Sequence, residues 1–130
     1  MSYPNIPDDL NLLSNEIIGL AIKVHNTLGP GLLESSYKEC LFYEIASAGY
    51  FVEKEKALPL VYETVKLDVG YRIDLLVENK LVIEVKAVDA LADIHTAQVL
   101  TYLKLSGNRL GLLINFNVPL LKNGIKRLVL

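Results

Sequence analysis

The segment from Ile73 to Lys86 places charged side chains inside what otherwise has the pattern of a buried β-hairpin. Branched aliphatic residues run along both arms, Ile73-Asp74-Leu75-Leu76-Val77 and Leu81-Val82-Ile83-Glu84-Val85-Lys86, around the polar turn Glu78-Asn79-Lys80. A three-residue turn pairs Val77 with Leu81, and the same register places Asp74 opposite Glu84. Like charges at directly opposed positions, with Cβ atoms about 5 Å apart, destabilise a sheet. A cation relieves such a conflict, and a divalent metal is the obvious candidate.

The neighbours of these carboxylates favour a site over a solvated strand face. Lys86 lies two residues after Glu84 and therefore shares its face. The alternative is an antiparallel hairpin with one wet face that happens to carry charges. Leu76, Val82 and Val88 are expected on the charged face, and charges embedded among aliphatic side chains usually indicate a site. A two-residue turn would instead shift the register and separate the two carboxylates.

Length and composition indicate one globular domain. The chain has 130 residues, of which 52% are hydrophobic and 22% charged, so we expect a single domain over residues 1–130 with a flexible arm at residues 1–7. No apolar run approaches the about 20 residues that cross a bilayer, and no signal peptide is recognised, so no membrane partner is expected. A single cysteine, Cys40, fits a cytoplasmic protein and a small buried residue. The hydrophobic content of 52% is also compatible with a homo-oligomer, because a subunit interface buries apolar side chains.

Hydrophobic periodicity and turn residues predict the order α-α-β-β-β-α-β-β, which favours an α/β fold with a mixed central sheet flanked by helices. Asp8 or Asp9 is expected to cap the first helix, Asp89 or Asp93 the third, and Gly107 to end the third. The second helix is expected to present Leu33, Tyr37, Cys40, Leu41 and Ile45 on one face. The expected helices cover residues 8–28, 32–48 and 91–105, and the expected strands cover residues 51–62 with an interruption near Pro59, 65–77, 81–88, 109–116 and 125–129.

Other polar residues have both a functional and a structural interpretation. Glu34 lies in the first turn of the second helix, where an acid also interacts favourably with the helix dipole. Gln98 and Tyr102 are spaced i, i+4 and share one face of the third helix, which is also compatible with an ordinary polar surface. His25 and His95 lack metal-ligand spacing, so we expect packed or capping histidines.

Together these residues resemble a known family. Gly31-Leu32-Leu33-Glu34-Ser35-Ser36-Tyr37 matches the Gly-x-x-Glu-x-x-Tyr signature of the GxxExxY proteins, a branch of the PD-(D/E)XK nuclease superfamily. The resemblance extends from His25-Asn26-Thr27-Leu28-Gly29-Pro30 through Asn115-Phe116, and so covers nearly the whole chain. The sequence departs from the superfamily pattern at Ile73, which stands at the position of the namesake proline.

The resemblance implies a restriction-endonuclease-like fold and a set of catalytic residues. The acidic helix position falls on Glu34, the strand aspartate on Asp74, and the Glu-x-Lys motif on Glu84-Val85-Lys86. The Gln-x-x-x-Tyr motif of RecB-like and Cas4-like branches falls on Gln98 and Tyr102. Asp74, Glu84 and the Val85 carbonyl are then expected to hold Mg²⁺ or Mn²⁺, which favour oxygen ligands, with Glu34 contributing through water or at a second ion. Lys86 would orient the attacking water or neutralise phosphate charge. Gln98 would position the phosphate or backbone, and Tyr102 would pair with a phosphate or with Glu34.

The expected substrate is a nucleic acid, most simply DNA in processing or repair. The net charge of −2 gives no overall attraction to nucleic acid, so binding depends on local groups. The alternatives are a non-catalytic nucleic-acid-binding or assembly module that keeps the fold, and a small-ligand binder. The lysines and arginines could contact phosphates or simply solubilise the surface, namely Lys54, Lys56, Lys66, Arg72, Lys80, Lys122, Lys126 and Arg127.

Overall fold

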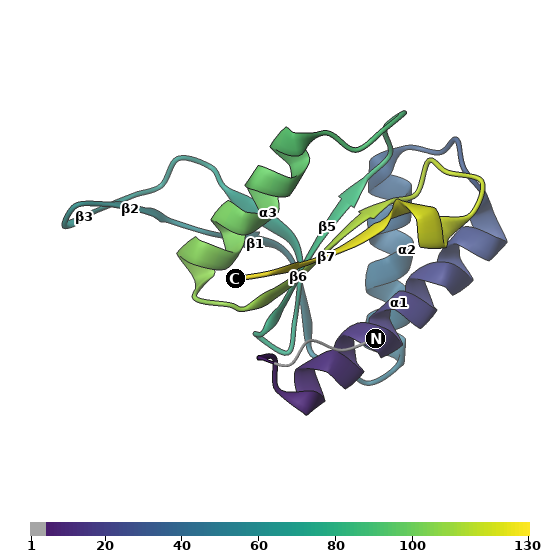
Figure 1. The fold of residues 1–130 in the computed structure, drawn as a ribbon, viewed down its shortest axis with the longest axis horizontal. Coiled ribbons are helices and arrows are strands. Elements are labelled where there is room, and N and C mark those ends of the chain that lie inside the picture. Colours follow the sequence, from purple (N-terminus) through teal and green to yellow (C-terminus); the bar gives the residue numbers. More distant parts are fainter. Residues whose placement is uncertain (1–4) are drawn as a thin grey trace.

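A five-stranded mixed sheet lies between two helical layers in the computed structural model, which describes residues 5–130 (Figure 1). Helices α1 (Asp8–Leu28) and α2 (Glu34–Ser47) cover one face, and α3 (Asp93–Ser106) covers the other. The order along the sheet is β1-β4-β5-β6-β7, with β5 and β6 parallel and the other neighbours antiparallel. The sheet strands are β1 (Val52–Ala57), β4 (Arg72–Val77), β5 (Leu81–Lys86), β6 (Leu110–Asn115) and β7 (Ile125–Val129), with a short 3-10 helix η1 (Leu121–Gly124) before β7. The expected mixed α/β class is confirmed.

Two apolar cores lie on the two faces of this sheet, because successive side chains of a strand point to opposite sides. Leu75 and Ile83 belong to the core beneath α1 and α2. Leu76 and Val82 belong to the second core, beneath α3. The even-numbered positions of β5, Glu84 and Lys86 among them, therefore face α3, as does Leu76 of β4. Ile73 also belongs to the core beneath α3, so the alternation of β4 is broken at Asp74.

A separate hairpin projects from the body of the molecule (Figure 1). It consists of β2 (Leu60–Tyr62) and β3 (Val65–Leu67), and its Val61, Tyr62 and Val65 side chains are exposed. The sequence pattern predicted two longer strands here, over residues 51–62 and 65–77. Pro59 ends the first because it cannot donate to a ladder, and a bend through Gly70, at φ 86°, interrupts the second.

The helix ends differ from the predicted caps. Pro7 precedes α1 as its N-cap residue, and Asp8 and Asp9 lie in the first turn, where they face the positive end of the helix dipole. Residues 1–4 of the predicted flexible arm lie outside the described residues. Of the remaining residues of that arm, Ile6 is 4% exposed and packs into the first core.

The start of α3 is capped by a histidine rather than by an aspartate. Ala92 is the N-cap residue, and its N–H donates to Nδ1 of His95 at 2.9 Å. The predictions of Asp89 or Asp93 as the cap are therefore wrong, while a capping histidine was expected. Gly107 ends the helix in the left-handed conformation that glycine adopts without a steric cost.

Helix α2 buries a narrower face than predicted. Tyr37, Leu41 and Ile45 are fully buried at i, i+4 and i+8 spacing, but Leu33 and Cys40 are exposed. The prediction of Cys40 as a small buried residue is wrong because the buried stripe is only one side chain wide. Within residues 5–130, no helix combines the length and the apolar character that spanning a bilayer requires.

Candidate active site

Asp74 and Glu84 meet where β4 and β5 stop pairing through their backbones. The ladder pairs Val77 with Leu81 and Leu75 with Ile83, as the three-residue turn requires. Beyond Ile83 the side chains take over as hydrogen-bond acceptors. The Asp74 N–H donates to Glu84 Oε2 at 2.8 Å, and the Val85 N–H donates to Asp74 Oδ2 at 2.9 Å. The predicted opposition of the two carboxylates is thus present, with each held by the other residue's strand.

Both carboxyl groups lie in surroundings that disfavour their charged forms. Glu84 is 2% exposed. Burial, followed by the negative charge of Asp74, raises the pKa of Glu84 from 4.5 to about 8. Burial also raises the pKa of Asp74, against the Val85 hydrogen bond that lowers it. Two adjacent carboxyl groups with raised pKa values, one buried and one half-buried, form a candidate functional site.

Lys86 and Glu34 flank this acid pair. The positive charge of Lys86 acts to lower the pKa of both Asp74 and Glu84, and the negative charge of Glu34 acts to raise both. Main-chain contacts fix the end of β5 behind Lys86, whose carbonyl oxygen accepts a hydrogen bond from Phe116 N–H at 2.9 Å. The structure therefore brings together the acidic helix position, the strand aspartate and the Glu-x-Lys pair predicted from sequence.

Glu34 does not form a group of three adjacent acidic side chains with Asp74 and Glu84. Among residues 5–130, no three His, Cys, Asp or Glu side chains form a group arranged to hold a metal ion. Asp74 and Glu84 are thus a two-carboxylate set, and Glu34 acts on them through its charge.

Tyr37 fixes the turn that leads into Glu34. Its hydroxyl donates to Gly29 O at 2.6 Å and accepts from Leu32 N–H at 3.1 Å. Its ring stacks on Phe116, with ring centres 4.6 Å apart. The last residue of the Gly-x-x-Glu-x-x-Tyr pattern is therefore a fully buried support for the start of α2.

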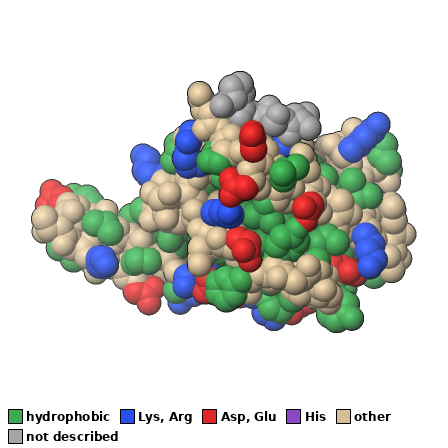
Figure 2. All heavy atoms as spheres, turned by 90° about the horizontal axis from the view of Figure 1, so that it is seen from below, with side chains coloured by type: hydrophobic (Ala, Val, Ile, Leu, Met, Phe, Trp, Pro, Cys, Tyr) green, Lys and Arg blue, Asp and Glu red, His purple; other side chains and the backbone are tan. Residues whose placement is uncertain are grey.

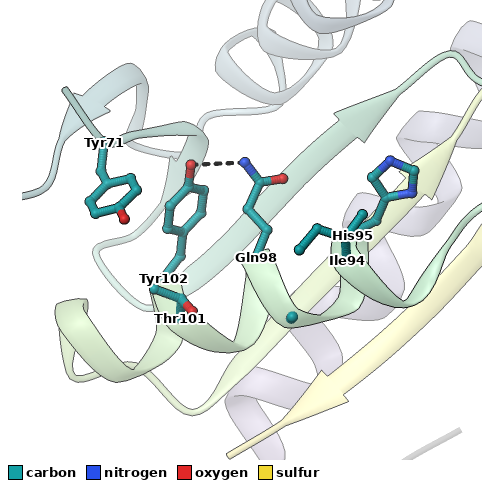
Figure 3. A pocket seen from close by; sticks show the side chains of 7 residues that line it. Tyr71, Ile94, His95, Gln98, Thr101 and Tyr102 are labelled. Carbon is teal, nitrogen blue, oxygen red and sulfur yellow. Dashed lines mark hydrogen bonds between the residues drawn. The ribbon is translucent and has the colours of Figure 1, made fainter. Parts of the chain in front are cut away.

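Gln98 and Tyr102 lie on the side of α3 that borders the acid pair. The Gln98 amide donates to the Tyr102 hydroxyl at 3.1 Å (Figure 3). Burial, followed by the charge of Glu84, raises the pKa of Tyr102. The predicted i, i+4 pair is therefore a connected pair next to the acid pair. Its outer side lines a pocket of about 330 Å³ with Tyr71, Ile94, His95, Ala97 and Thr101.

Two residues that the sequence pattern did not predict at the site, Lys38 and Glu55, form an ion pair beside the acid pair. Lys38 follows Glu34 by one turn of α2, and its side chain is only 17% exposed. Burial works to lower the pKa of Lys38, but Glu55 and then Asp74 outweigh it and raise this pKa. The positive charge of Lys38 lowers the pKa of Asp74 more than the charge of Lys86 does.

The register of β1 explains how Glu55 reaches this place. The pairs formed by Lys54 with Leu75 and by Lys56 with Ile73 put Glu55 opposite Asp74. Glu55 has φ 55°, a left-handed conformation that is uncommon for a residue with a side chain. The i, i+4 spacing of Lys38 from Glu34 was a visible signal. The pairing of β1 with β4, which brings Glu55 to the site, had no such signal in the sequence.

The remaining candidates have structural roles or surface partners. His25 is packed: it is 5% exposed, and its Nε2 lies 2.7 Å from Val118 O. Figure 2 shows basic and acidic side chains interspersed on one face, without a continuous basic surface there. Four cations of the strand region form ion pairs, namely Lys54 with Glu39, Lys56 with Glu53, Arg72 with Asp68 and Lys80 with Asp9. Exposed pairs of this kind favour the solubilising interpretation.

Comparison with known proteins gives one match. No curated protein and no solved structure matches the chain. The family model described as the PD-(D/E)XK nuclease superfamily matches residues 11–128, a range that contains the acid pair, Lys86, Gln98 and Tyr102. The chain belongs to the PD-(D/E)XK nuclease superfamily.

Proposed function

We propose that this protein is a GxxExxY-type nuclease that hydrolyses phosphodiester bonds in DNA with Mg²⁺ or Mn²⁺, in cytoplasmic DNA processing or repair. Membership of the nuclease superfamily supports phosphodiester hydrolysis in general terms. The observation that carries the metal-dependent proposal is the pair formed by half-buried Asp74 and buried Glu84, in which each carboxylate accepts a hydrogen bond from a backbone N–H of the other residue's strand. Two adjacent carboxylates are costly to ionise in this setting unless a cation joins them.

The donor set fits a hard divalent cation. Asp74 and Glu84 offer carboxylate oxygens, and Val85, whose N–H already holds Asp74, would add its carbonyl oxygen. Few protein ligands leave open positions for water and for a phosphate oxygen, which suits Mg²⁺ better than an enclosed structural site would. When bound, the ion would supply Lewis acidity at the scissile phosphate.

The protein's own residues would then complete the chemistry. Lys86 is a compact, rotatable ammonium group on the face of Glu84, suited to orienting the attacking water or neutralising charge on the phosphate. Gln98 and Tyr102 would hold the substrate strand through the polar ends of their linked side chains. Glu34 would act through water, since it is not part of a three-ligand group within residues 5–130.

Metal binding and cleavage test this proposal in sequence. Calorimetric titration with Mg²⁺ and Mn²⁺ is expected to show binding that Asp74→Asn abolishes. Cleavage assays on linear, circular and branched DNA, with RNA in parallel, are expected to show metal-dependent cutting by the parent. Lys86→Ala should lose cutting while it retains metal binding, and exchange of Glu16 for Gln on the exposed face of α1 serves as a matched control.

The outcomes separate the alternatives. Asp74→Asn and Lys86→Ala variants that cut as well as the parent would overturn the assignment of these residues. A folded parent that binds DNA but neither binds metal nor cuts would be a binding or assembly module on the same fold. Cutting of RNA in preference to DNA would overturn the DNA part of the proposal alone.

A further inference from the structure

The pocket beside α3 has the size and character of a ligand site. Its volume is about 330 Å³, within the range of about 300–1,000 Å³ that small-molecule sites occupy. One wall is a stripe of α3 with Ile94, Ala97, Gln98 and Thr101 at helical spacing, and the opposite end is Tyr71 (Figure 3). Aliphatic, aromatic and amide groups thus share one lining, which suits a flat, largely apolar ligand with polar edges.

Tyr71 is an aromatic platform that the fold holds in place. Its ring meets the buried Tyr102 ring edge to face, with centres 6.1 Å apart, while the residue stays 37% exposed. Its carbonyl oxygen accepts a hydrogen bond from Leu58 N–H at 3.0 Å, which fixes the backbone. An anchored and exposed ring offers stacking without the entropy cost of ordering a mobile side chain.

The pocket adjoins the acid pair through Tyr102. That residue lines the pocket, and the charges of Glu84 and Asp74 reach its hydroxyl and help to raise its pKa. A ligand in the pocket would therefore lie next to the proposed position of the scissile phosphate. Gln98, whose amide also binds Tyr102, presents polar atoms to the same space.

Electrostatics favour an uncharged group in this place. Among the described residues, no lysine or arginine lines this pocket. Four of the cations considered for phosphate binding are engaged in ion pairs. Stacking of a neutral base on an aromatic ring does not depend on a basic surface, and it contributes about 1–3 kcal/mol per base.

We infer that this pocket binds one unpaired nucleobase of the substrate strand, stacked on Tyr71, so that the protein acts on single-stranded or frayed nucleic acid. This inference rests on the proposed function for the identity of the ligand. A base held in a duplex has both faces stacked and cannot enter such a pocket, whereas an unpaired base can. Gln98 would then face the polar edge of the base.

Binding to base-bearing and abasic strands tests the inference without requiring cleavage. Fluorescence anisotropy would compare a short labelled oligothymidine with a strand of the same length that carries abasic residues, with Ca²⁺ in place of Mg²⁺. The parent is expected to prefer the base-bearing strand, and a paired duplex should compete poorly. Tyr71→Ala should weaken oligothymidine binding by roughly fivefold to 150-fold, which corresponds to about 1–3 kcal/mol, and should remove the preference over the abasic strand.

Matched variants separate stacking from folding. Tyr71→Phe keeps the ring and should bind like the parent. Tyr62→Ala removes a tyrosine that is 64% exposed on β2 and should change nothing. Ala97→Leu fills the pocket from an exposed position of α3 with a good helix former, and it should weaken binding without altering Tyr71. Thermal unfolding would verify that each variant is folded.

Two results would overturn the inference: equal binding of abasic and base-bearing strands by the parent, or unchanged oligothymidine binding by both Tyr71→Ala and Ala97→Leu. A protein that binds unpaired bases through Tyr71 but never cuts would overturn the proposed function, whereas the inferred base-binding pocket would be supported. A protein that cuts DNA but binds strands equally well in the Tyr71→Ala and Ala97→Leu variants would overturn this inference and leave the proposed function intact.

Discussion

Glu84 accepts a hydrogen bond from the backbone N–H of Asp74 at 2.8 Å, so the two acidic residues are joined before any cation is bound. The Asp74 carboxylate in turn accepts from Val85, the residue after Glu84. This reciprocal arrangement replaces the ladder at the end of β4 and β5. Side chains that already satisfy backbone donors are held in place, which is the preorganisation that a metal site requires.

The raised pKa of Glu84 predicts a specific pH dependence for the metal-free protein. Its pKa is about 8 in the folded state against 4.5 ordinarily. An acid with a raised folded pKa contributes stability that is complete below the unfolded value and is lost as pH rises through the folded value. The melting temperature should therefore fall between about pH 4.5 and pH 8. Glu84→Gln should flatten this decline, whereas Glu16→Gln should not; identical profiles for all three proteins would contradict the prediction.

Metal binding near neutral pH should release protons. Because Glu84 keeps its proton up to about pH 8, a cation that binds its carboxylate must displace that proton. Calorimetric heats of Mn²⁺ binding at pH 7 should therefore vary with the ionisation enthalpy of the buffer. Heats that are the same in Pipes and in Tris would contradict this prediction.

Lys38 should oppose the metal. Its positive charge acts on Asp74, so its removal in Lys38→Met should tighten Mn²⁺ binding by roughly threefold or more. Glu55→Gln should have the opposite effect because it leaves the Lys38 charge uncompensated next to Asp74. Titration calorimetry would measure the change in Mn²⁺ affinity in each variant. Weaker Mn²⁺ binding by Lys38→Met would contradict the prediction and indicate that Lys38 has a structural role.

Tyr37→Phe should loosen the start of α2 without collapsing the core. The variant keeps the stack on Phe116 but loses the hydrogen bonds to Gly29 and Leu32. Loss of buried hydrogen bonds costs about 1–3 kcal/mol. Urea unfolding should show this loss, and Tyr43→Phe, which alters a tyrosine 68% exposed on the same helix, should not. Equal stability of the two variants would contradict the role assigned to Tyr37.

Gly111 sets the distance between α3 and β6. A Cβ at this position would lie 2.8 Å from Cγ1 of the buried Val99, so Gly111→Ala must displace the Val99 side chain or the helix that also carries Gln98 and Tyr102. Overpacking of this kind costs about 1–3 kcal/mol. Val99→Ala in the Gly111→Ala background should recover part of that stability, as measured by urea unfolding. Strictly additive losses would exclude the clash as the cause.

The local sequence pattern was sufficient to predict the register of the β4–β5 hairpin and the shared helical face of Gln98 and Tyr102. Its branched residues and three-residue turn predicted the pairing of Val77 with Leu81, and the structure has that register. The spacing of Gln98 and Tyr102 predicted a shared helical face, and the two side chains are hydrogen-bonded there. Both predictions depend on residues close in sequence, where strand and helix periodicity determine which side chains meet.

The misplaced features depend on packing between distant segments or on local details that hydrophobic periodicity does not resolve. Cys40 fits an apolar pattern but is exposed, because the width of the buried stripe on α2 depends on how that helix lies on the sheet. Of the strands predicted at residues 51–62 and 65–77, only residues 60–62 and 65–67 form the projecting hairpin, because chain breakers at Pro59 and Gly70 separate them from β1 and β4. His95 caps α3 at Ala92, a choice among several polar residues that local spacing did not resolve.

The sequence by itself determined the α/β class and the opposition of Asp74 and Glu84, because one short turn fixes one register. Only the tertiary structure decided that β1 lies beside β4, which brings Glu55 and Lys38 to Asp74. It alone placed Tyr71 against Tyr102 at the pocket. Residues separated by many positions in the chain meet only when the helices and the sheet bury their apolar faces against one another, and no local periodicity encodes that packing.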